Sequence, residues 1–364
     1  MKLIEITSFL EQLAPLAFQE SYDNSGLLLG NYDMEIHKAL ITLDVTEKVV
    51  EEARQKGCNL IISHHPLIFG SIKKITANNA TERMIVELIK HDIAVYAIHT
   101  NLDNMHQGVN DILCRKLGLS DTRILSPLKE MLRKLVTFCP SESAEAVRMA
   151  LFEAGAGKIG NYDSCSFNAS GYGSFRAGEK ANPFVGEVNK LHFENEIRIE
   201  VVYPVNIENR LLAALLSTHP YEEVAYDIYP LRNAYKDAGA GMIGKLGKAV
   251  EEEAFLKNLK EITGIPCIKH SELLAKKVKN VAVCGGSGSF LIEEAIQQGA
   301  DVFITADIKY HQYFEAEKKL LLADIGHFES EQFVKELLYT LLIEKFPNFA
   351  LLISEQVTNP VFYL

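Results

Sequence analysis

Short apolar runs alternate with helix-forming segments at both ends of the chain, and this alternation limits the fold more than any other feature of the sequence. The N-terminal third has strand-like runs at 39–44, 59–63 and 93–98 and helical segments at 47–56, 81–90 and 108–117. The C-terminal third has strand-like runs at 278–283, 301–305, 320–324 and 350–354, with helices reaching about 298, spanning 310–318 and running from 326 to about 344. Such alternation predicts an α/β domain with a mostly parallel sheet covered by helices.

The segment between these thirds has a different character. Its pattern predicts strand, helix, strand, strand, helix and strand, at 132–138, 145–154, 163–169, 196–203, 207–217 and 224–229. This is the element order of a ferredoxin-like domain. We therefore predict an α+β insert at 127–238 that interrupts a discontinuous α/β domain made of 1–126 and 239–364. The polar, glycine-containing stretch 235–241 is expected to be the linker by which the chain returns.

Length, charge and cysteine usage exclude several classes of protein. The 364 residues exceed the usual size of one domain, in agreement with two cores. With 37 basic and 48 acidic residues the net charge is −11, which argues against a nucleic-acid binder. No apolar run approaches the roughly 20 residues that span a membrane. Six scattered cysteines and the absence of a secretory signal predict reduced thiols and a cytoplasmic protein.

Histidines follow three of the strand-like runs. His64 and His65 end the run at 59–63, His99 precedes Asp103 by four residues, and His327 precedes Glu331 by four. Open α/β sheets bind ligands at the carboxyl ends of their strands. Imidazole and carboxylate are ligands of divalent transition metals, so these segments predict a metal site.

The spacing of these residues suggests two ions. His327 and Glu331 lie one helical turn apart and face the same side. His64 and His65 are adjacent, so on an extended backbone their side chains diverge and two neighbouring ions can take one each. Glu331 or Asp103 can then bridge the ions, as in two-metal hydrolytic sites. We expect two divalent ions, with zinc first and manganese, iron, cobalt or nickel also compatible with these ligands.

Other polar residues are open to more than one interpretation. His99 is either a metal ligand or, as we favour slightly, a residue that orients one. The stretch Gly285–Ser289 can cradle a phosphate or form a plain tight turn. Asp307, Lys309, Tyr310 and His311 can serve substrate binding or proton transfer, or merely begin a helix. Asp23–Asn24 can line the cleft or form a turn. His219–Glu223 can form a second polar site, or a helix cap and a turn. Glu329 is expected to face solvent.

Six motifs occur together in one order. They are Tyr22-Asp-Asn-Ser-Gly-Leu, Ser63-His-His-Pro, His99-Thr-Asn-Leu-Asp103, Cys284-Gly-Gly-Ser-Gly, Thr305-Ala-Asp-Ile-Lys-Tyr-His311 and Asp324-Ile-Gly-His-Phe-Glu-Ser-Glu331. In this set the chain resembles the GTP cyclohydrolase I type 2 homolog family, also called the NIF-three-like family. The insert resembles the PII/CutA-like domain of the longer bacterial members, through Gly171-Tyr-Gly-Ser-Phe-Arg176 and His219-Pro-Tyr-Glu-Glu223.

The resemblance has consequences for the site and for assembly. It implies a two-metal centre on the five residues His64, His65, Asp103, His327 and Glu331. It also implies a toroidal homohexamer whose metal sites face an inner cavity. Two departures from the family pattern are visible, because Tyr22 stands where the family usually has Trp and Ala306 where Gly is common. Neither departure removes a ligand, although the substrate pocket can differ in shape.

The residues favour a metal-dependent hydrolase of a nucleotide or related small molecule. Metal-bound water is the expected nucleophile, with Glu331, His99 and His311 as candidates for proton transfer. The alternative belongs to another class: a non-catalytic metal-binding regulatory or adaptor protein whose insert senses a small molecule. An open coordination position distinguishes the two, since catalytic metal sites keep room for water and structural sites do not.

Overall fold

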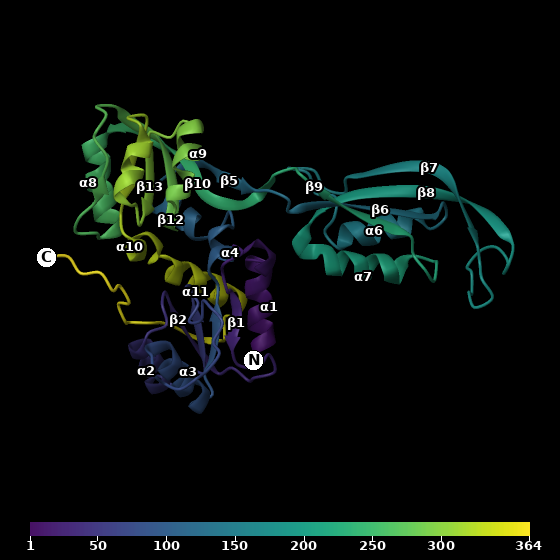
Figure 1. Cartoon of the computed structure of the whole chain (residues 1–364), viewed down its shortest axis with the longest axis horizontal. Helices are drawn as coiled ribbons and strands as arrows, with labels where there is room; N and C mark the ends of the chain where they lie inside the picture. The colour runs from purple at the N-terminus through teal and green to yellow at the C-terminus, as the bar shows by residue number, and fades with distance from the viewer. The chain divides into compact units, whose positions relative to one another are not determined.

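The computed structural model describes residues 1–364 (Figure 1). The chain divides into two compact units. Unit 1 comprises Met1–Pro127 and Lys236–Leu364, and unit 2 comprises Leu128–Tyr235. Unit 1 is therefore discontinuous in sequence and is built from both ends of the chain.

The first sheet of unit 1 has five strands in the order β1-β4-β3-β2-β15. Strands β4, β3, β2 and β15 run parallel, and β1 is antiparallel to β4. Every residue of β3 and β4 is buried, as expected for parallel strands covered on both faces. The strands are β1 (Gly26–Leu29), β2 (Lys38–Thr42), β3 (Leu60–Ser63), β4 (Ala94–Ala97) and β15 (Ala350–Ile353).

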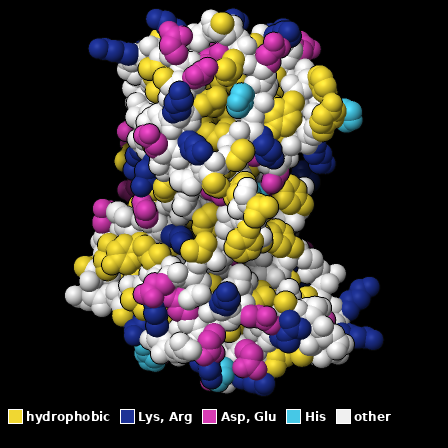
Figure 2. All heavy atoms as spheres, turned by 90° about the vertical axis from the view of Figure 1, so that its left-hand side faces the viewer, with side chains coloured by type: hydrophobic (Ala, Val, Ile, Leu, Met, Phe, Trp, Pro, Cys, Tyr) yellow, Lys and Arg dark blue, Asp and Glu magenta, His cyan; other side chains and the backbone are white.

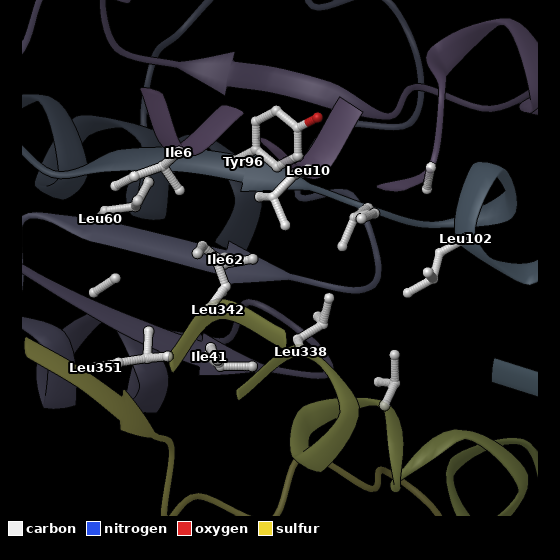
Figure 3. Packing of buried hydrophobic residues seen from close by; sticks show 14 of the residues in the cluster. Ile6, Leu10, Ile41, Leu60, Ile62, Tyr96, Leu102, Leu338, Leu342 and Leu351 are labelled. Atoms are coloured by element: carbon white, nitrogen blue, oxygen red, sulfur yellow. The ribbon is translucent and has the colours of Figure 1, made fainter. Parts of the chain in front are cut away.

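Helices from opposite ends of the chain cover one face of this sheet. Ile6 and Leu10 on α1 (Leu3–Leu13) share a buried cluster with Leu338 and Leu342 on α11 (Val334–Lys345), and Figure 3 shows these side chains against those of β2, β3 and β4. The other face is covered by α2 (Glu47–Gln55) and α3 (Ala80–Lys90). Thr46 accepts a hydrogen bond from the Val49 amide and caps α2, as its sequence position predicts.

The second sheet of unit 1 has six strands in the order β11-β14-β13-β12-β10-β5. Its centre, β12 to β14, is parallel, whereas β10 and β11 pair antiparallel with their neighbours. One face packs against α5 (Val109–Lys116) and α8 (Glu252–Thr263), and the other against α9 (Ile292–Gln297). The strands are β5 (Ser120–Leu128), β10 (Tyr235–Glu251), β11 (Lys269–His270), β12 (Lys277–Ser287), β13 (Val302–Ala306) and β14 (Leu321–Asp324).

The α/β class is confirmed, but the prediction of one mostly parallel sheet is wrong, because unit 1 has two mixed sheets. The last strand, β15, comes from the C-terminal third of the chain but pairs with β2 in the N-terminal sheet. The stretch 235–241, expected to be a linker, is the start of β10. Alternation predicts strands locally, whereas the choice of partner strand depends on contacts distant in sequence.

Two predicted helices also differ. The segment expected to be helical at 310–318 is a 3-10 helix, Tyr310–Ala316, which ends where Glu317 takes a positive φ of 47°. The long helix expected from Gly326 is broken into α10 (His327–Glu331) and α11. The break follows from packing, since Phe333 is buried with the second sheet and Val334 with the first.

Unit 2 has the predicted element order β-α-β-β-α-β. Its four strands pair antiparallel in the order β7-β8-β6-β9. Both helices pack on one face of the sheet, around Leu135, Val147, Ile199 and Leu215. The elements are β6 (Leu132–Pro140), α6 (Ala144–Glu153), β7 (Ser166–Arg176), β8 (Leu191–Pro204), α7 (Glu208–Thr218) and β9 (Tyr226–Leu231).

None of the helices is both long enough and apolar enough to span a bilayer. In the view of Figure 2, acidic and basic side chains are interspersed above and below, and hydrophobic side chains gather at mid-height. That face carries no large field of one sign, so the net charge of −11 is not concentrated on it.

A buried carboxylate joins the chain after β15 to α2. Glu52 accepts hydrogen bonds from the Ser354 hydroxyl at 2.6 Å, the Glu355 amide at 3.0 Å and the Lys56 ammonium at 2.8 Å. Burial alone would raise its pKa, but these donors together lower the pKa of Glu52 below its usual value. The C-terminal strand is therefore tied to the first half of unit 1 by one charged side chain.

We expect Glu52→Gln to remove about 1 kcal/mol of stability at neutral pH and to flatten its acid dependence. Because the pKa is lower in the folded than in the unfolded state, the stabilisation is present above the unfolded value of about 4.3 and is lost as pH falls through the folded-state pKa. Urea unfolding of both proteins between neutral pH and about pH 3 measures the difference. An unchanged difference across this range would contradict the assignment.

Candidate metal centre

The candidate ligands come from both sheets of unit 1. His64 and His65 directly follow β3, and Asp103 ends α4 (Thr100–Asp103), which follows β4. His327 and Glu331 lie on α10, which follows β14. The structure thus brings the five residues singled out in the sequence to one place, at the carboxyl ends of parallel strands.

One carboxylate oxygen lies at the centre of the group. Glu331 Oε2 is 3.0 Å from His65 Nε2, 3.2 Å from His327 Nε2 and 3.9 Å from His64 Nε2. His64 Nε2 is also 3.5 Å from Asp103 Oδ1. These atoms form two sets that each can hold a metal ion: His65, His327 and Glu331, and His64, Asp103 and Glu331. Glu331 belongs to both sets.

The three imidazoles are held in one tautomer by the atoms behind them. Nδ1 of His64 donates to the Ile98 carbonyl at 2.8 Å, that of His65 to Asp44 at 2.7 Å and that of His327 to Asp307 at 2.6 Å. With the proton on Nδ1, a neutral ring turns the lone pair of Nε2 toward the centre. Metal-ligating histidines are oriented in this way.

Three buried polar atoms at the centre have no hydrogen-bond partner: His64 Nε2, Asp103 Oδ1 and Glu331 Oε2. Leaving a buried polar group unpaired costs roughly 1–3 kcal/mol, and more for a charged group. Three such atoms converging on one point are explained if a cation lies between them. The donor set therefore fits a divalent ion.

Burial lowers the pKa of His64 to about 3. Its contacts with Asp103 and Glu331 are therefore made by a neutral imidazole and are not ion pairs. A metal ion needs the neutral form, which this position enforces.

The carboxylates around His65 and His327 raise the pKa values of these two imidazoles. Burial lowers the pKa of His65, but the hydrogen bond to Asp44 and the negative charge of Glu331 raise it to about 10 overall. For His327 burial likewise opposes Glu331 and Asp307, which raise its pKa to about 9. Without a metal ion, protons on these rings neutralise Glu331, and a bound cation would take their place.

The surroundings shift the pKa values of Asp103 and Glu331 in opposite directions. Burial and the nearby Glu331 raise the pKa of Asp103 well above its usual value. Burial also acts on Glu331, but His327 and His65 lower the pKa of Glu331 well below its usual value. Two ionised carboxylates this close repel each other, and a cation bound between them would offset the repulsion.

His99 lies beside the two adjacent histidines. Its ring centroid is 5.3 Å from that of His64 and 5.2 Å from that of His65, and the three rings form a further group that can hold an ion. Nδ1 of His99 donates to Asp23 at 2.8 Å, and Asp23 also accepts hydrogen bonds from Thr100. Asp23 thus orients His99, and its amide donates to the Glu20 carbonyl in a turn. Neither Asp23 nor Asn24 lines the cavity, so the turn interpretation holds and the cleft interpretation does not.

The glycine-rich stretch is not a phosphate cradle. The amides of Gly285, Gly286 and Gly288 donate to the side chains of Asn110, Ser330 and Thr305, at 2.8, 2.9 and 2.8 Å. These amides are therefore not free for an anion. Glycine is needed at 286 for a different reason: its φ is +62°, and a Cβ there would lie 2.3 Å from Glu331 Oε1.

Three other predicted residues lie apart from the centre. Glu329, expected in solvent, is 7% exposed and accepts a hydrogen bond from Asn359 at 3.0 Å. His311 is exposed on the 3-10 helix, stacks near Tyr310 and does not line the metal cavity. In unit 2, His219 accepts from the Tyr221 amide and donates to the Phe138 carbonyl, which is a structural role.

Four of the five residues, His65, Asp103, His327 and Glu331, line a cavity of about 880 Å³ within unit 1, and the fully buried His64 lies behind them. Exposed aromatic side chains, Tyr22, Phe69 and Phe290, also line it. Asn359, Pro360, Val361 and Tyr363 of the C-terminal segment form part of its wall. Tyr22 is one of the two departures from the family pattern, whereas Ala306 is fully buried behind the site. The cavity has the size of small-molecule sites in proteins.

The sequence analysis did not single out Asp44, which connects the C-terminal segment to His65 of the candidate metal centre. Asp44 accepts from His65 Nδ1 through one oxygen and from the Thr358 hydroxyl, at 2.6 Å, through the other. A signal was present, because Asp44 follows β2, the parallel neighbour of β3. An acidic residue after the adjacent strand is where an orienting carboxylate is expected.

We expect Asp44→Ala to weaken divalent metal binding by about 10- to 100-fold, because His65 loses the acceptor that fixes its tautomer. Isothermal titration of metal-stripped protein with Zn²⁺ measures the change. Asp33→Ala is the matched control, since Asp33 pairs with Lys2 at the surface. Equal affinity of the Asp44 and Asp33 variants would contradict the orienting role.

The family model described as Duf34/NIF3 (NGG1p interacting factor 3) matches residues 1–360. The chain belongs to this family. The resemblance carried by the six motifs is thereby confirmed. A Duf34/NIF3 relative from Bacillus subtilis (strain 168), named GTP cyclohydrolase 1 type 2 homolog, is 40% identical over 369 residues, which cover 99% of this chain and 98% of the relative.

Solved structures of similar proteins share the fold over the whole chain. A Bacillus cereus protein related to NIF3 is 38% identical with a TM-score of 0.84, covering 100% of this chain and 99% of that one. A Staphylococcus aureus protein is 31% identical with a TM-score of 0.78 and the same coverage. The long form with its middle unit is therefore shared by these relatives.

Proposed function

We propose that unit 1 holds two divalent metal ions and hydrolyses a nucleotide or related small molecule. The observation that carries the proposal is the convergence of three buried, unpartnered atoms, His64 Nε2, Asp103 Oδ1 and Glu331 Oε2. The name of the Bacillus subtilis relative, GTP cyclohydrolase 1 type 2 homolog, supports a purine nucleotide as the substrate class.

Each residue of the centre has a defined part. His65 and His327 would hold one ion, His64 and Asp103 the other, and Glu331 both. When bound, two such ions acidify water near neutral pH and polarise the bond to be cleaved. Zinc is the ion we expect, because imidazole and carboxylate without thiolate suit it, and manganese, iron, cobalt or nickel are compatible.

The surrounding residues would bind the substrate and handle protons. Asp44, Asp307 and the Ile98 carbonyl orient the imidazoles. Nε2 of His99, whose Nδ1 is held by Asp23, can accept a proton beside the centre. The aromatic side chains of the cavity, Tyr22, Phe69 and Phe290, offer ring faces on which a base can stack.

Asp103→Ala and His327→Ala are expected to lower both the bound metal and the turnover of purified protein. Metal is counted by elemental analysis, and turnover is followed on a panel of nucleotides and esters with the Asp103 variant as the blank. Full metal loading in both variants would overturn the site assignment. If the variants lost metal but the wild-type protein showed no turnover, hydrolysis would be refuted and the metal-site assignment would be retained.

A second function is supported by a separate cavity of about 660 Å³ in unit 2. The protein would then be a metal-binding regulator or adaptor whose insert senses a small molecule, with ions that serve structure. We also propose that unit 2 is a PII/CutA-like, ferredoxin-like insert, which its strand order supports. The toroidal homohexamer implied by the family resemblance is tested by light scattering of the purified chain, where a monomer would contradict it.

A further inference from the structure

A pocket separate from the metal centre lies within unit 2. Helices α6 and α7 cover one face of its sheet, and the pocket lies on the other, over β7 and β8. Two segments enclose it: the connection from β7 to β8, including Ala181–Phe184, and the segment after α7, including Tyr221–Glu223. A hydrogen bond of 2.9 Å from the Asn182 amide to Glu222 joins these segments. The pocket therefore has walls from three parts of the chain.

Two glycines give the pocket its depth. Gly171 and Gly173 alternate along β7 and face the same side, because side chains two residues apart share a face of a strand. A Cβ on Gly171 would meet no atom within 4 Å, so this position opens into free space. A Cβ on Gly173 would lie 2.2 Å from Glu196 Oε2, so the glycine makes room for that carboxylate.

Aromatic rings form the walls. The ring centroids of Phe175 and Phe184 lie 6.1 and 6.3 Å from that of Tyr221, and Phe138 lines the same pocket. These side chains come from four separate segments of unit 2. Aromatic faces carry partial negative charge and attract cations.

The charges lining the pocket are arranged around Glu196. Its Oε1 accepts a hydrogen bond of 3.0 Å from the Tyr221 hydroxyl, which fixes the carboxylate among the rings. Arg198, the basic residue nearest along β8, pairs with Glu200 at 3.0 Å and lies over the Phe138 ring. Arg198 is engaged in this way, and Arg176, which also lines the pocket, is exposed at the end of β7. Glu196 is the lining charge that a hydrogen bond from Tyr221 holds against the rings.

We propose that this pocket binds a small organic cation with a flat apolar body. The ammonium or guanidinium group would lie at Glu196 and the body between the rings of Phe175, Phe184 and Tyr221. The size of the cavity, about 660 Å³, suits a molecule of this kind. The site is independent of the metal chemistry of unit 1, and it adds a ligand class to the middle unit.

Three naphthyl probes test the charge preference on the full-length, metal-loaded protein: naphthylmethylamine, naphthylmethanol and naphthoate. The chain has no tryptophan, so naphthyl emission can be read directly. We expect the ammonium to bind at least tenfold more tightly than the alcohol and the carboxylate to bind most weakly. Binding of the amine no tighter than the alcohol, or tightest binding of the carboxylate, would overturn the proposal.

Two variants test whether the amine binds in this pocket. Gly171→Leu fills it and should abolish binding of the amine, whereas Gly247→Leu, an exposed strand position with equally free space in unit 1, should not. Glu196→Gln keeps the acceptor for Tyr221 and should weaken the amine at least tenfold while leaving the alcohol unchanged. Unaltered binding of the amine to either pocket variant would refute the site, and circular dichroism with metal content verifies that each variant is folded.

Discussion

Glu331→Gln is expected to remove most of the bound metal from both sets of ligands at once. Glu331 Oε2 is shared by the set of His65 and His327 and by the set of His64 and Asp103, so its charge would serve both of the proposed ions. Loss of a supporting residue costs about 10- to 100-fold in metal affinity, and loss of a shared ligand should exceed this. Elemental analysis after dialysis against a metal buffer gives the number of ions retained.

Glu329→Gln is the matched control, two residues away on the same short helix. Glu329 is equally buried, but it accepts a hydrogen bond from Asn359 and belongs to no candidate ligand set. A glutamine there can still accept that bond, so metal content should stay at the wild-type value. If both variants kept their metal, Glu331 would not be the shared ligand; if both lost it, the effect would be structural.

Leu215→Ala is expected to destabilise unit 2 by about 3 kcal/mol, because it opens a cavity in a core that the unit forms alone. Leu215 is fully buried between α7 and the sheet. For a domain of this size the midpoint of thermal unfolding should fall by about 10–20 °C. Calorimetry of the full chain measures the shift, and the metal content should not change.

The neighbouring leucine supplies the control for this experiment. Leu216 is 51% exposed, so Leu216→Ala removes the same atoms without opening a cavity and should change stability by less than about 0.5 kcal/mol. Similar losses for the two variants would contradict the assignment of the effect to core packing, because alanine is at least as good a helix former as leucine. A loss of metal in the Leu215 variant would contradict the independence of the two units.

Much of the local structure could be predicted from the sequence. Runs such as Leu60–Ser63 are uniformly buried strands because parallel strands covered on both faces need no alternation. Thr46 marks the start of α2 through its side-chain acceptor. The failures concern the segment after Gly326 and the strand at 350–353, where the partners are distant in sequence.

The sequence predicted which candidate ligands lie together but not the residues that orient them. His64, His65, Asp103, His327 and Glu331 could be singled out because their imidazoles and carboxylates follow strands at recognisable spacings, and the structure brings them together. Asp44 carries only the weak signal of following the strand beside β3, and Gly286 carries none, since an acidic residue after a strand and a glycine in a turn are both common. The roles of both appear only when His65 and Glu331 lie beside them.

The sequence by itself determined the α/β class, the three-part division of the chain and the residue types able to bind a metal, because these depend on local periodicity and spacing. Only the tertiary structure decided that unit 1 contains two sheets, that β15 pairs with β2, and that Glu331 lies between two sets of ligands. It also decided that the glycine amides are already bonded and that Gly171 faces an open pocket. These features depend on which distant segments pack together, and the free energy of that packing is not encoded in any short stretch of sequence.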